Sequence, residues 1–224
     1  MAVQLPLGIT LPDSATFDNF YAGDNAAALH SIRSGIEAFV YLWGASGTGR
    51  THLLQAACQG AAAAGATAVY LPLAQHAEFS PELLEGLETT RLVCLDDVDA
   101  IAGLDAWEQA LFHLYNRLRD SERRLLAAAD RAPGALPLNL ADLRSRLGWG
   151  PVFQLRALSD TDKLAALKLR ALHRGLELSD EVGQYLLKRC PRDLHSLFSL
   201  LDSLDRAALA AQRRLTIPFV REHL

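Results

Sequence analysis

Residues 44–51 have the sequence GASGTGRT, which fits the pattern GxxxxGK[ST] with arginine in place of lysine and leaves few folds open to this chain. It follows a short apolar run and precedes a long helical pattern. A loop of this kind wraps phosphates with its backbone N–H groups, and the next helix points its positive dipole end at the anion. Gly44, Gly47 and Gly49 allow positive φ angles or a close backbone approach. The segment therefore predicts a phosphate-binding loop, against the alternative of a simple glycine-rich turn.

The other residues of this loop offer further groups to a nucleotide. We expect Thr48, and His52 directly after the loop, to contribute backbone N–H groups, and Thr51 to turn its hydroxyl toward Mg²⁺. Arg50 keeps the positive charge of the usual lysine, but its guanidinium is broader and forked. We therefore expect nucleotide binding without fast hydrolysis.

A pair of acids follows a second apolar run, in the segment RLVCLDDV at residues 91–98. Nucleotide sites of this kind need a carboxylate at the end of a neighbouring strand to hold Mg²⁺ through water. Asp96 is predicted to fill that role, and Asp97 to orient an attacking water. The alternative is a solvated acid pair that simply ends a strand. Together with the glycine loop upstream, the segment has the arrangement of Walker A and Walker B motifs.

Five apolar runs of strand length alternate with longer amphipathic segments. The runs cover residues 39–44, 67–73, 91–98, 123–130 and 152–155. Continuous apolar runs of this length are typical of parallel strands buried on both faces. In residues 106–120, Trp107, Leu111 and Leu114 fall on one helical face. The alternation predicts an α/β fold, a doubly wound five-stranded parallel sheet. Ser80 followed by Pro81 indicates a further helix start.

After about residue 157 the strand pattern stops and three helical patterns follow. Ser159 with Asp162 can open the first, and Gly175 can close it. Ser179 can cap the second, and Pro191 lies where the third would begin. We therefore predict three parts: an extended tail (1–14), an α/β nucleotide-binding domain (15–156) and a small all-helical domain (157–224).

The composition excludes several classes of protein. No apolar run approaches the roughly 20 residues that span a bilayer, and residues 1–14 lack the basic start of a signal peptide. We therefore expect a cytoplasmic protein without membrane contact. The three cysteines are too few and too widely spaced for a disulfide framework or a metal site. A net charge of −4 argues against autonomous binding of duplex DNA.

Several segments together resemble the DnaA family of AAA+ proteins. TFDNFYAGDN (16–25) resembles the opening motif of that family, which implies that Phe17 and Phe20 lie near the adenine. LVCLDDVDAIAG resembles its Walker B segment, and AADRAP (128–133) its sensor-1 strand, which implies that Asp130 lies near the γ-phosphate. The match covers nearly the whole chain from about residue 14. It implies an AAA+ P-loop domain followed by a helical lid domain.

Two arginines acquire expected roles from the same resemblance. DLRSRLGWG (142–150) is similar to the SRF-WG segment of the family, so Arg146 corresponds to the arginine finger. PRDLHSLFSLLDSL (191–204) places Arg192 at the sensor-2 position in the lid. Arg146 would then act on nucleotide held by a neighbouring subunit, and Arg192 on nucleotide in the same chain. The alternative for both is a solvated surface arginine.

The tail is the last segment with an expected function. The sequence ends before the DNA-binding domain of the family would begin, which resembles a short regulatory branch whose members carry a sliding-clamp-binding peptide. Here that peptide would be Gln4, Leu5, Pro6 and Leu7, with Gly8 where proline is common. Gln4 can donate a hydrogen bond, the two leucines can fill an apolar pocket, and proline reduces the entropy lost on docking. The alternative is an ordinary exposed tail.

The resemblance implies a regulator of replication initiation. Such a protein would bind ADP, or ATP, with Mg²⁺, dock on the sliding clamp (the β subunit of DNA polymerase III), and meet DNA mainly through that clamp. Arg146 would stimulate ATP hydrolysis by DnaA, and a homodimer is one option for its assembly. One alternative is a self-contained AAA+ ATPase that remodels or loads a replication partner. Another is a nucleotide-free adaptor that lost phosphate binding through Arg50.

Overall fold

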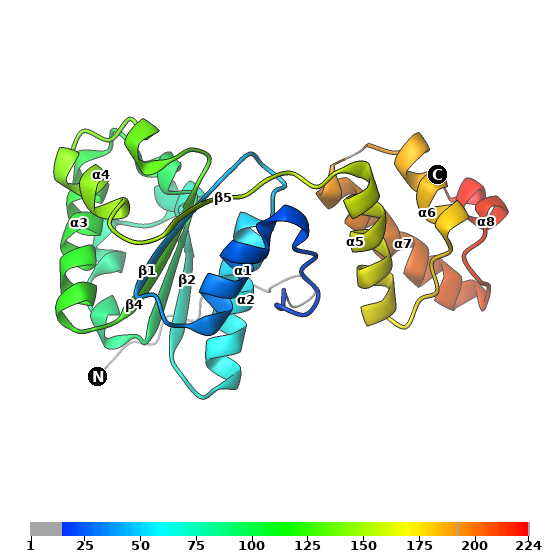
Figure 1. Ribbon diagram of the computed structural model, residues 1–224, viewed down its shortest axis with the longest axis horizontal. Coiled ribbons are helices and arrows are strands. Elements are labelled where there is room, and N and C mark those ends of the chain that lie inside the picture. The colour runs from blue at the N-terminus through cyan, green and yellow to red at the C-terminus, as the bar shows by residue number, and fades with distance from the viewer. Residues whose placement is uncertain (1–14, 192, 224) are drawn as a thin grey trace.

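The computed structural model describes residues 15–191 and 193–223. Five parallel strands form one sheet in the order β2-β3-β4-β1-β5 (Figure 1). The strands are β1 (Phe39–Trp43), β2 (Ala68–Pro72), β3 (Leu92–Asp96), β4 (Arg124–Ala129) and β5 (Val152–Gln154). Each lies within one of the five apolar runs, so the predicted five-stranded parallel sheet is confirmed.

Helices cover both faces of this sheet (Figure 1). They are α1 (Ala26–Ser34), α2 (Arg50–Ala63), α3 (Asp105–Asp120) and α4 (Ala141–Leu147). Because side chains of a strand alternate between faces, one core forms on each side. Leu42 and Leu126 pack with α1 and α2, whereas Leu125 and Val93 pack with α3 and α4. The P-loop helix α2 and the pair α3–α4 therefore lie on opposite faces.

The segment between β2 and β3 differs from the expectation of a helix starting at Ser80. Pro81 does begin a helical turn, but it is a 3-10 helix that ends at Leu84. Gly86 then takes a φ of +76°, which breaks the turn before the next short 3-10 helix. Further 3-10 helices are Gly23–Asn25, Leu73–Glu78, Leu87–Thr89, Val98–Ile101 and Pro133–Ala135.

The C-terminal part is a separate bundle of helices (Figure 1). Its members are α5 (Asp160–His173), α6 (Asp180–Arg189), α7 (Leu194–Ala211) and α8 (Ile217–Glu222). Ser159 and Asp162 form the predicted capping box, and Ser179 caps α6. The third predicted helix starts later than Pro191, because the Asp193 carboxylate accepts the Ser196 N–H and caps α7. The predicted all-helical C-terminal domain is confirmed.

Side chains of the N-terminal segment tie the helical bundle to the sheet. The buried Asn25 amide donates to the Arg156 carbonyl at 3.0 Å and accepts the Arg156 N–H at 2.8 Å, just after β5. The Tyr21 hydroxyl donates to Asp162 at the start of α5 at 3.3 Å. The bundle is therefore held over the edge of the sheet where the glycine loop lies.

The described helices and the three cysteines bear on the expectations about membranes and disulfides. In the part of the chain that the structure describes, no helix has both the length and the apolar character needed to cross a bilayer. Cys58, Cys94 and Cys190 carry free thiols.

Candidate nucleotide-binding site

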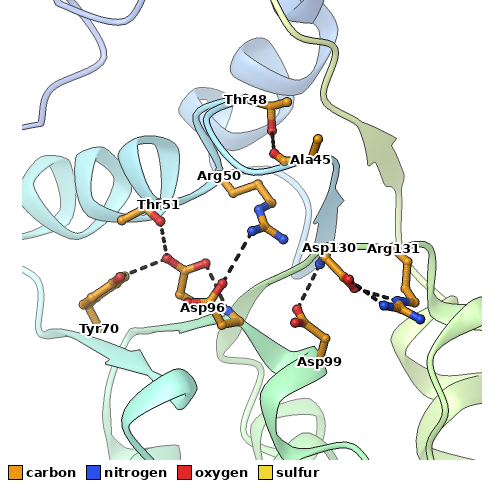
Figure 2. Close-up of polar contacts among 10 residues, drawn as sticks. Ala45, Thr48, Arg50, Thr51, Tyr70, Asp96, Asp99, Asp130 and Arg131 are labelled. Carbon is orange, nitrogen blue, oxygen red and sulfur yellow. Dashed lines mark hydrogen bonds and ion pairs between the residues drawn. The ribbon is translucent and has the colours of Figure 1, made fainter. Parts of the chain in front are cut away.

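The glycine loop between β1 and α2 has the backbone conformation of a phosphate-binding loop. Gly47 and Gly49 take φ angles of +80° and +97°, which favour glycine. A Cβ on Gly44 would lie 2.5 Å from the Leu155 carbonyl oxygen, and one on Gly49 would lie 2.6 Å from the Phe20 ring. The Thr48 hydroxyl donates to the Ala45 carbonyl at 2.9 Å (Figure 2). The three glycines thus meet a conformational need or a close approach, and Thr48 closes the turn.

This loop borders a cavity of about 740 Å³, a size that accommodates a mononucleotide. The N-terminal segment and the helical bundle complete its walls. The lining residues are Asn19, Phe20, Tyr21, Ser46, Gly47, Thr48, Gly49, Arg50, Thr51, His52, Asp97, Leu158, Ala166, Asp193, Leu194 and Phe198. Glycines and Arg50 line the loop side, whereas the side next to the bundle is mostly apolar, with Leu158, Ala166, Leu194 and Phe198. The cavity therefore suits a ligand with phosphates at one end and an aromatic base at the other.

Asp96 is the last residue of β3, and its carboxylate contacts Thr51 in the first turn of α2. Its carboxylate is 1% exposed and accepts three hydrogen bonds: from the Thr51 hydroxyl at 2.6 Å, the Tyr70 phenol at 2.9 Å and the Asp97 N–H at 3.0 Å. Figure 2 shows both hydroxyls directed at Asp96. Nucleotide-bound Mg²⁺ usually takes one or two protein oxygens and fills its shell with phosphates and water. The adjoining Thr51 hydroxyl and Asp96 carboxylate fit that donor set.

Arg50 reaches across the loop side of the cavity toward Asp97. Its Nη2 lies 3.5 Å from Asp97 Oδ1, whereas its buried Nη1 meets no hydrogen-bond acceptor among the described residues. A buried guanidinium nitrogen without an acceptor is costly, and a phosphate oxygen is a strong acceptor for it. One guanidinium nitrogen of Arg50, Nη2, therefore pairs with Asp97, whereas the other, Nη1, can donate to a ligand phosphate.

Asp97, in the wall of the cavity, has a raised pKa. Burial raises the pKa of its carboxyl, and the Asp96 charge raises the pKa further, while Arg50 opposes both. The folded chain binds the Asp97 proton more tightly than the unfolded chain does. The free energy of unfolding therefore falls as the pH rises from 3.8, the ordinary pKa of this carboxyl, through its raised pKa in the folded chain.

Asp97→Asn is therefore expected to raise the melting temperature of the ligand-free protein at neutral pH. It should also remove part of the loss of stability over that pH window. Thermal unfolding at a series of pH values measures both effects. Asp120→Asn, which changes an exposed acid on α3, is the matched control. A lower melting temperature for Asp97→Asn at neutral pH would mean that the ion pair with Arg50 outweighs the burial of the charge.

Asp130 directly follows β4 at the same edge of the sheet, and its carboxylate is directed at Arg131 and not at Arg50 (Figure 2). Its N–H donates to the Asp99 carboxylate at 2.9 Å, and its own carboxylate pairs with Arg131 at 2.6 Å (Figure 2). The hydrogen bond from Arg131 lowers the pKa of Asp130, so this acid stays ionised. Asp130 is not among the residues that line the cavity.

The remaining expected nucleotide contacts differ in position. Phe20 lines the cavity, whereas Phe17 packs beside Gly60 on α2, outside the lining. The His52 ring contacts the Thr16 carbonyl at 2.9 Å and so links α2 to the N-terminal segment. Burial lowers the pKa of this ring. Arg192 lies outside the described residues.

Arg146 is held on the other face of the sheet, at the end of α4. Its guanidinium lies over the rings of Phe112, Trp149 and Tyr115, at 4.7, 5.0 and 5.9 Å, and its Nη1 donates to the Asn116 side chain. Trp149 is 60% exposed. Because α3 and α4 lie opposite α2, Arg146 and the cavity of its own chain are separated by the sheet.

The buried acid Glu108 fixes the start of the helix that carries Arg146. Its carboxylate accepts the N–H groups of Gly103, Asn139 and Leu140, at 2.7, 3.1 and 2.7 Å. Leu140 directly precedes α4. Glu108 was not predicted from the sequence, although an acid within the apolar stripe of residues 106–120 was a signal for it. Asn116, Asn25 and Tyr70 gave no comparable signal.

A glycine loop between a parallel strand and a helix, a buried carboxylate on its threonine and a helical bundle closing the cavity define a P-loop nucleotide-binding fold of the AAA+ class. A family model of the bacterial DnaA ATPase domain matches residues 11–154, and a model of the Hda lid domain matches residues 160–224. The chain belongs to the DnaA family, and it is a DnaA-related replication protein with a lid of the Hda type.

Solved structures of DnaA proteins have the same fold. Domain III of the Thermotoga maritima replication initiation protein DnaA aligns with a TM-score of 0.78 at 20% identity, over 93% of this chain and 95% of that one. AMPPCP-bound DnaA from Aquifex aeolicus aligns with a TM-score of 0.72 at 26% identity, over 87% and 66%. A replication initiator DnaA bound to AMPPCP and single-stranded DNA aligns with a TM-score of 0.73 at 24% identity, over 91% and 69%.

Proposed function

We propose that this protein binds ADP in the cavity and stimulates ATP hydrolysis by DnaA from the opposite face. The observation that carries nucleotide binding is the buried Arg50 Nη1 beside the glycine loop, which lacks an acceptor among the described residues. Four acids, Asp96, Asp97, Asp99 and Asp130, lie near this end of the sheet, where Arg50 and Arg131 supply the opposing charge. Extra negative charge is disfavoured there, which supports a diphosphate over a triphosphate.

ADP with Mg²⁺ is therefore expected to raise the melting temperature of the purified protein. At about 100 times its Kd a ligand adds about 2.7 kcal/mol of stability. For a chain of this size that corresponds to roughly 5 to 10 °C. ATP should shift the transition less than ADP at equal concentration, and adenosine, which lacks phosphates, less still. The absence of any shift at saturating ADP would favour the nucleotide-free adaptor instead.

The proposed site of action on DnaA is the surface around Arg146. An arginine finger acts in trans, so it has to lie away from the nucleotide of its own chain and near an exposed surface. Arg146 on the α3–α4 face, beside the exposed Trp149, meets both conditions. Aromatic residues and arginine are also the side chains most often found at the energetic centre of interfaces. In this proposal the helical lid, residues 157–224, closes over ADP bound to the domain 15–156.

Docking on the sliding clamp would bring the finger to DnaA on DNA. The proposed peptide, residues 4–7, lies outside the described residues. A linked binding site raises the effective concentration of the second partner into the millimolar range. We therefore propose that clamp, DNA and this protein form one assembly in the cytoplasm, in which the clamp supplies proximity and Arg146 supplies the catalytic charge.

A self-contained ATPase is the second candidate, favoured by the hydrogen bond between Thr51 and Asp96 and by Asp97 in the cavity wall. It requires steady turnover of ATP by the purified protein alone, and loss of that turnover in Asp96→Asn. The ion pair between Arg50 and Asp97 argues against it, because Asp97 is then engaged where an attacking water would need it.

A further inference from the structure

Tyr70 is a hydroxyl-bearing residue that contacts the Walker B carboxylate but belongs to neither Walker motif. It lies on the edge strand β2, whereas Thr51 starts α2 and Asp96 ends β3. Its phenol donates to the same oxygen, Asp96 Oδ2, that accepts the Thr51 hydroxyl. A buried carboxylate oxygen thus receives two hydroxyl protons from two different elements (Figure 2).

The register of the parallel strands explains this contact. Tyr70 is opposite Cys94, and Pro72 is opposite Asp96. Since side chains alternate along a strand, Tyr70, Cys94 and Asp96 share the face that is covered by α2. The long phenol side chain reaches along this face, diagonally across the pair of strands, to the carboxylate two residues further on. A shorter polar side chain at position 70 would not span that diagonal.

The Asp97 N–H completes the set by donating to the other oxygen, Asp96 Oδ1. Both carboxylate oxygens are therefore engaged, and the plane of the group is fixed by three donors from three places in the chain. A carboxylate held in this way accepts the Thr51 proton in one orientation only. The lone pairs of the Thr51 oxygen then remain free on the side away from Asp96.

We propose that Tyr70 is a positioning residue for nucleotide-bound Mg²⁺. Its phenol holds the Asp96 carboxylate as the acceptor of the Thr51 proton, so that the Thr51 oxygen is presented to the cation. Groups that orient metal ligands in this indirect way typically change metal affinity about 10- to 100-fold when they are removed. The inference rests on the proposed binding of a nucleotide with Mg²⁺.

A purely structural role is the competing explanation, because the Tyr70 ring also packs against the core beneath α2. Tyr70→Phe keeps the ring and removes only the hydroxyl, so it separates the two roles. Tyr41→Phe is the matched control. It removes a phenol from the neighbouring part of the sheet, on the opposite face, where the hydroxyl donates to the Arg131 carbonyl at 3.0 Å.

The test is calorimetric titration of the full chain with ADP, once with MgCl₂ and once with EDTA. The measured quantity is the Kd for ADP in EDTA divided by the Kd for ADP in MgCl₂. This ratio reports how much Mg²⁺ tightens binding. Tyr70→Phe is expected to lower this ratio about tenfold and to leave Kd in EDTA unchanged. Tyr41→Phe should leave the ratio as in the unmodified chain. In an Asp96→Asn background, Tyr70→Phe should have no further effect on the ratio, because it acts through that carboxylate.

Two results would overturn the inference alone: an unchanged ratio in Tyr70→Phe, or equal weakening with and without Mg²⁺, which would make the phenol a support of the fold. If the unmodified chain does not bind ADP, the proposed nucleotide function fails and the inference fails with it. ADP binding that Mg²⁺ does not change would leave the proposed function standing and remove only the premise of the inference. The titration of the unmodified chain therefore distinguishes the two failures.

Discussion

Replacing Arg146 with alanine is expected to reduce the stimulation of DnaA's ATP hydrolysis about 10³-fold or to the unstimulated rate. An arginine finger supplies positive charge to the transition state of phosphoryl transfer and contributes at least that factor. ADP binding by the variant should be unchanged, because Arg146 lies on the face of the sheet opposite the P-loop helix. Single-turnover hydrolysis of ATP on DnaA measures the first effect, and ADP titration the second.

Arg146→Lys should lose most of the stimulation as well. Lysine keeps the charge, but it lacks the planar fork that stacks on Phe112 and Trp149 and binds two phosphate oxygens at once. Arg119→Ala, an exposed arginine on α3 paired with Asp120, is the control and should stimulate normally. Normal stimulation by Arg146→Ala, with its melting temperature intact, would exclude the finger.

Gly49→Ala is expected to weaken ADP binding by about 100-fold, and Gly47→Ala by about tenfold. Both positions have positive φ, so any side chain costs roughly 1 to 3 kcal/mol of backbone strain. The difference between them arises from space. A Cβ on Gly49 would lie 2.6 Å from the Phe20 ring in the cavity wall, whereas one on Gly47 would meet no atom within 4 Å among the described residues.

Titration of ADP into the two variants measures this difference under one set of conditions. Because strain is common to both, Gly47→Ala serves as the internal control for Gly49→Ala. Equal losses would mean that the Phe20 ring moves aside without cost and that backbone conformation alone controls the site. Unchanged affinity in both variants would place the nucleotide elsewhere in the molecule.

The sheet and the loop could be predicted because each has a strong local pattern. Buried parallel strands are continuous apolar runs, and all five were visible in that form. Helices α1 and α4 were not predicted. They span only nine and seven residues, so each shows few turns of helical periodicity. The segment after Ser80 looked like a helix start, yet Gly86 confines it to short 3-10 turns.

The site shows the same division between local and non-local signals. The glycine loop and Asp96 follow from adjacent residues, whereas the hydrogen bond from Tyr70 depends on the register between β2 and β3 and joins residues 26 positions apart. Asn25 bonds the backbone at Arg156, a partner that no pattern around residue 25 indicates. Likewise, two of the aromatic rings around Arg146, those of Phe112 and Tyr115, come from α3, and only the packing of α4 on α3 brings them to the arginine.

ATP hydrolysis by purified DnaA, with the clamp loaded on DNA, should be measured with and without this protein to test whether it stimulates DnaA. The intact chain should be compared with one lacking residues 1–8. Strong stimulation by the intact chain, lost without those residues, is the predicted result. No stimulation of DnaA, together with ATP turnover by this protein alone, would contradict the proposal and support a self-contained ATPase.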